Sequence, residues 1–200
     1  MKRYELPKLK YSFDALEPFI SRKNLELHYT KNHAAYVNGA NNTLEKLEKF
    51  RRGELEIDVK ATLRDLSFNL SGHILHVIFW ESMAPPNTGK NIPFGKIGDK
   101  IKEDFGSFEV FKKEFSSAAK TCEGNGWAIL VFDQFLNQLL VVQIEKHNIA
   151  SISGLKVLLA LDVWEHSWVL DYNDRSKYIE NWWNIVSFDY AEKEFSKLSF

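Results

Sequence analysis

The segment Asp162-Val163-Trp164-Glu165-His166 decides the fold that we predict for the second half of this 200-residue chain. It ends an apolar run that begins at Val157, and such a run predicts a buried strand. If the segment is helical, Asp162 and His166 share one face, because they are four residues apart. If Asp162 ends the strand, it lies on the polar rim where ligands gather. Either arrangement brings a carboxylate and an imidazole to one edge of the strand.

Two further strands precede this one. Residues 127–132 and 138–144 are apolar runs joined by a short polar turn around Asp133 and Asn137, which predicts an antiparallel hairpin. Gly124-Asn125-Gly126 breaks the chain before the hairpin. A helix is predicted over residues 96–120, and the aromatic-rich tail over residues 177–198 is also predicted to be helical.

The first half of the chain predicts two helices. Ser21 can cap the first, which extends to Phe50, and Gly39 could bend it. The second covers residues 63–82, where apolar residues recur at steps of three and four. Residues 84–91 contain two prolines, Asn and Gly, which marks a domain boundary. Helices followed by a small antiparallel sheet with helices around it indicate an α+β fold.

Composition excludes several classes of protein. The formal net charge is -1, so general binding of nucleic acid or an anionic membrane, which needs a basic excess, is not expected. The single Cys122 excludes an internal disulfide framework and a cysteine-rich metal site. No apolar run is long enough to cross a bilayer and no signal peptide is visible, so we expect a cytoplasmic protein.

Histidines are the main reservoir of metal ligands. His28 lies in the first predicted helix, His73 and His76 lie in the second, and His166 follows the third strand. Three imidazoles with Asp162 suit iron or manganese, and less specifically zinc. They do not suit calcium or magnesium, which prefer oxygen. A histidine on a helix is more often a packing or surface residue, so spacing alone leaves both interpretations open.

An ordered set of stretches resembles the iron/manganese superoxide dismutase family. Asp162-Val163-Trp164-Glu165-His166 resembles the family signature, and the resemblance covers nearly the whole chain. The other matching stretches are Tyr4 to Pro7 and Tyr11 to Pro18 near the N-terminus, His28 to Val37 in the first helix, Gly72 to Trp80 in the second, Gly124 to Trp127 before the hairpin, and Trp183 to Val186 in the tail.

The resemblance implies an N-terminal antiparallel helical hairpin, which we assign to residues 1–86. It also implies a C-terminal α/β domain with a three-stranded antiparallel sheet, which we assign to residues 87–200. One iron or manganese ion, with iron slightly favoured, is expected between the two domains. The implied metal ligands are His28, His76, Asp162 and His166, with solvent in a fifth place. His73 matches a position that is not a ligand.

The activity implied by the resemblance is conversion of superoxide to oxygen and hydrogen peroxide. The metal is alternately reduced and oxidised, and protons enter through metal-bound solvent. Tyr36 matches a tyrosine near the substrate channel, and Trp127 and Trp164 match aromatic walls that keep the pocket dry. Arg175 is expected to line the entrance for the anion, although Ser176 and a one-residue deletion before Tyr178 depart from the family pattern.

The chain also departs from the family at the amide that contacts the solvent. The position on the second helix is Gly72, and the position after the hairpin is His147. This pair resembles a histidine-containing branch with iron-using and metal-flexible members. We expect His147 to contact the metal-bound solvent and to bias the site toward iron, since an imidazole can donate one hydrogen bond as an amide does.

The resemblance further implies a homodimer or homotetramer. Glu165 is expected to reach the partner subunit's His166 and orient that ligand. Many members pair a histidine at the position of Asn32 with a tyrosine at the position of Val169, and both are replaced here.

Two other functions remain open. A metal-dependent hydrolase could use the same ligands, but the chain lacks a His-Glu-x-x-His arrangement. A non-catalytic metal-binding relative is disfavoured because all four ligands and Tyr36 are present.

Overall fold

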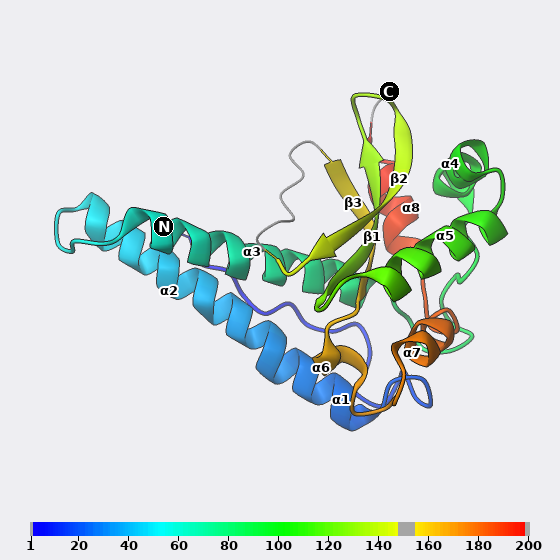
Figure 1. The fold of residues 1–200 in the computed structure, drawn as a ribbon, viewed down its shortest axis with the longest axis horizontal. Coiled ribbons are helices and arrows are strands. Elements are labelled where there is room, and N and C mark those ends of the chain that lie inside the picture. The colour runs from blue at the N-terminus through cyan, green and yellow to red at the C-terminus, as the bar shows by residue number, and fades with distance from the viewer. Residues whose placement is uncertain (1, 148–154, 199–200) are drawn as a thin grey trace.

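The chain folds into a helical arm and a helix-covered three-stranded sheet, which confirms the predicted α+β class (Figure 1). This computed structural model describes residues 2–147 and 155–198. No helix in these two ranges is both long and apolar enough to cross a membrane. The elements are α1 (Arg22–Leu27), a π-helical turn η1 (His28–His33), α2 (Ala34–Arg51), α3 (Val59–Glu81), α4 (Gly95–Phe105), α5 (Phe108–Thr121), β1 (Gly126–Asp133), β2 (Gln138–Glu145), β3 (Leu155–Asp162), α6 (Glu165–Trp168), α7 (Arg175–Trp182) and α8 (Asp189–Phe195).

The helical arm consists of α1, η1, α2 and α3. Its first half, from α1 to α2, is one helical segment with a distortion near its start. Ser21 caps it as predicted, because its side chain accepts a hydrogen bond from the Asn24 N–H. The bend expected at Gly39 was wrong, since α2 passes through this residue, and the distortion is instead the π turn η1. Gly39 leaves room for the Asn69 side chain of α3, because a Cβ at position 39 would lie 2.2 Å from Asn69 Oδ1.

The second half of the arm, α3, runs antiparallel to α2 (Figure 1). It begins four residues earlier than predicted because Asp58 caps it, with its carboxylate 3.0 Å from the Ala61 nitrogen. The C-terminal part of α3 is buried between η1, in the first half of the arm, and β3 of the sheet. Phe79 lies in the hydrophobic core, while His73 and His76 are buried polar residues of the same helix.

The predicted helix over residues 96–120 was wrong as a single element. Gly106, with φ of +82°, ends α4, and the Ser107 side chain then accepts a hydrogen bond from the Val110 N–H to start α5. The tail likewise forms two helices, α7 and α8. Between them, Val186 forms a β-bridge with Met83, which ties the tail to the end of α3.

The sheet has the order β2-β1-β3, with both neighbouring pairs antiparallel, and the predicted hairpin is confirmed. Strand β1 is central and buried along its whole length, so both of its faces must be apolar. Helices α4, α5 and α8 pack against the sheet, and α3 packs against β3. The register places Trp127 of β1 opposite Asp162 at the end of β3. The sheet thereby delivers two predicted site residues side by side.

Gly126 yields a prediction about stability. A Cβ at this position would lie 2.2 Å from the Ile144 carbonyl oxygen and 2.5 Å from Cys122 Sγ, and the backbone oxygen cannot move without disturbing the hairpin. We expect Gly126→Ala to lower the free energy of unfolding by about 3 kcal/mol, measured by urea denaturation. Gly53→Ala is the control, because its φ of +72° is strained but its surroundings are open, which predicts a loss of about 1 kcal/mol. Equal losses in the two variants would contradict the steric argument.

Candidate metal centre

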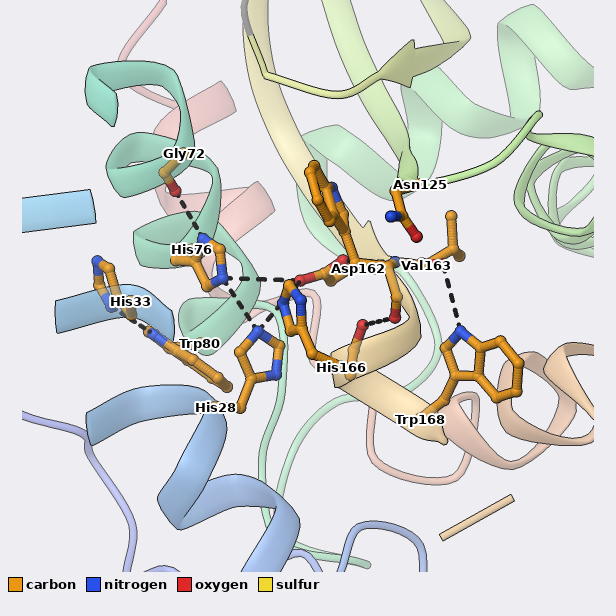
Figure 2. A network of polar contacts seen from close by, with 12 residues as sticks. His28, His33, Gly72, His76, Trp80, Asn125, Asp162, Val163, His166 and Trp168 are labelled. Atoms are coloured by element: carbon orange, nitrogen blue, oxygen red, sulfur yellow. Dashed lines mark hydrogen bonds and ion pairs between the residues drawn. The ribbon is translucent and has the colours of Figure 1, made fainter. Parts of the chain in front are cut away.

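Four side chains from different elements converge between the arm and the sheet (Figure 2). Their ligand atoms all lie within 4.8 Å of one another. Asp162 Oδ2 is 3.1 Å from His28 Nε2, 3.3 Å from His166 Nε2 and 3.6 Å from His76 Nε2. These are the four ligands predicted from the sequence, and His73 is not part of the cluster. Residues from positions 28 to 166 therefore meet at one point.

The turn after β3 brings two of the ligands together. Asp162 Oδ1 accepts a hydrogen bond from the Trp164 N–H at 2.8 Å, which turns the chain directly after the strand. Helix α6 then makes a single turn and returns His166 toward the carboxylate. The other oxygen, Oδ2, has no hydrogen-bond partner among the described residues and faces the three imidazoles.

The donor set fits a metal ion. Asp162 Oδ2 and His166 Nε2 are buried atoms without a hydrogen-bond partner in the described part of the chain, and such atoms are costly unless a ligand satisfies them. His76 holds its Nδ1 2.6 Å from the Gly72 carbonyl oxygen, so Nδ1 carries the proton and Nε2 presents its lone pair to the cluster. Three nitrogens and one oxygen suit iron, manganese or zinc.

Protonation states in the site also favour metal binding. Burial lowers the pKa of both His28 and His76, which keeps these imidazoles neutral. Burial alone would raise the pKa of Asp162, but the electrostatic attraction of the neighbouring His166 and His28 side chains holds the pKa of this carboxyl below its usual value. Neutral imidazoles and an ionised carboxylate are the forms that ligate metals.

The π turn η1 places His28, and the sequence did not reveal it. The Ala34 N–H bonds to the Tyr29 carbonyl oxygen five residues back, as a π-helix requires. In this wider turn, residues five apart are separated by a smaller angle than in an α-helix, and His28 and His33 both face α3, where they contact His76 and His73. In an α-helix they would diverge. The available signal was the pair of histidines at a spacing of five, which does not suit an amphipathic α-helix.

Aromatic rings enclose the cluster. Trp127 is fully buried, with its ring centroid 5.0 Å from that of His76. The Tyr36 ring centroid lies 5.2 Å from that of His76 and 4.7 Å from that of His147. Burial raises the pKa of Tyr36, so its hydroxyl keeps its proton at neutral pH. The rings of Trp164 and His147 are nearly parallel, with centroids 4.9 Å apart.

His147 is fully buried, and neither of its ring nitrogens has a hydrogen-bond partner among the described residues. Burial lowers its pKa to about 4, which makes it neutral at physiological pH. Gly72 makes room for it: a Cβ at position 72 would lie 2.9 Å from His147 Nδ1 and 3.0 Å from the Tyr36 ring. The absence of a side chain on α3 and the presence of an imidazole after β2 are therefore one steric arrangement.

Two predicted site residues lie outside this enclosure. Glu165 is exposed at the start of α6, and its backbone N–H donates to Asn125 Oδ1 at 3.3 Å. Arg175 donates to the carbonyl oxygens of Cys122 and Gly124 at 2.7 and 2.8 Å, which ties α7 to the loop before β1. The role of Arg175 at the entrance for an anion stays a prediction.

The contact between Gly72 and His147 predicts a coupling in stability. Gly72→Ala is expected to lower the free energy of unfolding by about 1 to 3 kcal/mol, because the new methyl group overlaps His147 and Tyr36. His147→Ala removes one of the two overlaps, so Gly72→Ala should cost less in that background, measured by urea denaturation. Strictly additive losses in the double variant would contradict the contact.

Comparison with known proteins agrees with this geometry. Residues 3–84 match the family model for the alpha-hairpin domain of iron/manganese superoxide dismutases, and residues 93–194 match the model for their C-terminal domain. The predicted boundary between residues 86 and 87 falls in the gap between the two matches.

Curated relatives match along almost the entire chain. A superoxide dismutase [Fe] from Pyrobaculum aerophilum is 59% identical over 98% of this chain and 93% of its own length. A superoxide dismutase [Mn/Fe] from Aeropyrum pernix is 53% identical over 96% and 90%, and a superoxide dismutase [Fe] from Methanothermobacter thermautotrophicus is 48% identical over 98% and 97%. The predicted enzyme class and the predicted iron or manganese cofactor are confirmed. The chain belongs to the iron/manganese superoxide dismutase family.

Proposed function

We propose that the chain dismutates superoxide at the centre formed by His28, His76, Asp162 and His166. The observation that carries this proposal is the buried convergence of three imidazoles and one carboxylate, with ligand atoms within 4.8 Å of one another. When bound there, iron or manganese supplies a redox couple that exchanges one electron at a time, which zinc lacks. The hydrolase alternative has no comparable support, because the chain lacks the His-Glu-x-x-His arrangement in which the glutamate would act as a general base.

The protein's own residues prepare the site for this chemistry. The Gly72 carbonyl orients His76, and the Trp164 N–H orients Asp162. Trp127 and Trp164 exclude bulk water, which strengthens electrostatic interactions inside the pocket. Tyr36 retains its hydroxyl proton and is placed to hold it near the reacting anion, since dismutation consumes protons.

His147 is the residue that we propose to bias the metal preference toward iron. A neutral imidazole offers one N–H donor, and its two nitrogens are otherwise without partners among the described residues. This donor would stabilise a bound solvent molecule, and the strength of such an interaction tunes the potential of a metal.

We further propose a homo-oligomer in which Glu165 reaches the partner subunit's His166. Glu165 is exposed beside Val169 and Leu170, which are 54% and 49% exposed, so a polar group and apolar side chains lie on one short surface segment. In the described part of the chain the Glu165 carboxylate has no hydrogen-bond partner, and the polar contact of the adjacent His166 is made through Nε2 to Asp162, which leaves its Nδ1 for an orienting group.

The cytoplasm is the compartment that we propose for this enzyme. The single thiol, Cys122, is buried and free, which suits a reducing compartment. Detection of the native protein outside the cytoplasmic fraction would contradict this assignment.

Reconstitution with single metals tests the proposed function. The apoprotein loaded separately with iron, manganese or zinc should consume superoxide with iron or manganese and not with zinc. His76→Gln should lose the metal, whereas His73→Gln should retain it, measured by elemental analysis, because only His76 belongs to the cluster. His147→Gln should shift the ratio of iron to manganese activity. Zinc as the sole bound ion without superoxide consumption would overturn the proposal, and an unchanged ratio would overturn the role of His147.

The oligomer is tested by light scattering of the metal-loaded protein. We expect a mass at least twice that of one 23.3 kDa chain. Glu165→Gln should weaken association and speed metal loss, while the exposed Glu180→Gln on α7 should change neither. A monomeric mass for the parent protein would contradict the proposed contact.

A further inference from the structure

Behind the site, hydrogen bonds link Trp80, His33 and His73 in series, and neither of these histidines is a metal ligand. We call these three side chains the Trp80–His33–His73 series. Trp80 Nε1 lies 2.9 Å from His33 Nδ1, and His33 Nε2 lies 2.8 Å from His73 Nδ1. All three side chains are buried, with exposed fractions of 7% or less. Trp80 and His73 come from α3, and His33 comes from the end of the π turn η1.

The indole of Trp80 fixes the direction of hydrogen-bond donation in the Trp80–His33–His73 series. Its N–H can only donate, so His33 Nδ1 must be an unprotonated acceptor. The proton of a neutral His33 then lies on Nε2 and is donated to His73 Nδ1. His73 in turn carries its own proton on Nε2. Protonation of either imidazole on both nitrogens would place two N–H groups face to face, so both bonds persist only with both rings neutral.

The His73 end of the Trp80–His33–His73 series is covered by the N-terminal segment of the protein. The Tyr4 ring meets the His73 ring edge-on, with centroids 5.3 Å apart. Asn41 on α2 holds Tyr4 through two hydrogen bonds of 2.8 Å: the Tyr4 N–H donates to Asn41 Oδ1, and Asn41 Nδ2 donates to the Tyr4 carbonyl oxygen. The cover is therefore fixed to the arm, and the three bonded side chains are shielded from water.

The other two members of the Trp80–His33–His73 series each contact a metal ligand. The rings of His33 and His76 are nearly parallel, at 18°, with centroids 5.1 Å apart. The Trp80 ring meets that of His28 edge-on, at 72° with centroids 4.9 Å apart. In Figure 2, His33 and Trp80 lie on the side of His28 and His76 that is away from Asp162.

The two ligands differ in how their orientation is set. His76 has the Gly72 carbonyl as an acceptor for its Nδ1 proton. Among the described residues, His28 has polar contacts only through Nε2, to His76 and Asp162. Its ring orientation therefore depends on packing, and Trp80 supplies one wall of that packing.

We propose that His33 and His73 are positioning residues of the metal centre. Their hydrogen bonds hold the Trp80 indole in one orientation. The Trp80 and His33 rings in turn orient the His28 and His76 imidazoles. This inference rests on the proposed metal site. Residues of similar size without hydrogen-bonding groups would fill the same space. At position 33 they would leave the Trp80 N–H buried without an acceptor, and at position 73 they would leave the His33 Nε2–H without one, so that the His33 ring could rotate away from Trp80.

The test compares variants that keep or remove the hydrogen bonds in the iron-loaded protein. Gln at position 33 offers both an acceptor and a donor, and Gln at position 73 offers an acceptor, whereas Leu offers neither. We expect His33→Leu and His73→Leu to alter the electron paramagnetic resonance spectrum of ferric iron. We also expect iron loss to a chelator to be about tenfold faster. His33→Gln and His73→Gln should retain the parent spectrum.

A matched control separates positioning from stability. Leu47→Ala in the core of α2 should lower the free energy of unfolding without altering the iron spectrum, because Leu47 is buried but outside the cluster. Trp80→Phe keeps a ring beside His28 and removes the N–H, so it should alter the spectrum in the same way and provides a second variant if a Leu variant does not fold. Its effect and that of His73→Leu should not be additive.

Two outcomes have different meanings. If the Leu and Phe variants bind iron and keep the parent spectrum and release rate, the histidines serve packing alone and this inference is overturned. If the parent protein binds neither iron nor manganese, the proposed function itself fails.

Discussion

The structure depends on burying one ionised carboxylate. Asp162 is fully buried at the end of β3, and an isolated charge there would be prohibitively costly. Three imidazoles from three other elements surround it, and the ion that the set fits would supply the compensating positive charge. Because the ligands come from both the arm and the sheet, a bound ion would stabilise the docking of the two halves, in addition to the hydrophobic core that they share.

The architecture around Asp162 serves this requirement at each level. The register of the sheet sets Trp127 beside Asp162, and the single turn of α6 returns His166 to it. The π turn contributes His28, and it simultaneously delivers His33 to the rear of the site. A π-helical turn is less favourable than an α-helical one and is found mostly at functional positions. Its cost here is offset by placing two histidines on one side of the helix.

Much of the site could be predicted from local pattern. His28, His76, Asp162 and His166 lie in stretches that resemble one family, and the strands have clear apolar runs bounded by turn residues. The break at Gly106 was missed because the phenylalanine spacing continues across it, and periodicity does not register a single positive φ. The helical caps at Ser21 and Asp58 are equally local, yet only the first was recognised, since residues 59–62 carry little apolar periodicity.

The amino-acid sequence by itself indicated the fold class through its apolar patterns, and the ligand set came from the ordered resemblance to one family, because spacing alone did not separate ligands from packing histidines. Only the tertiary structure decided which other side chains meet the ligands. The fit of His147 against Gly72, and the bonds from Trp80 through His33 to His73, join residues separated by 40 to 75 positions. Such contacts depend on how close the arm lies to the sheet, which local spacing does not encode. They also depend on a change of helical period, and its local signal, the five-residue spacing of His28 and His33, does not give the partners of these residues.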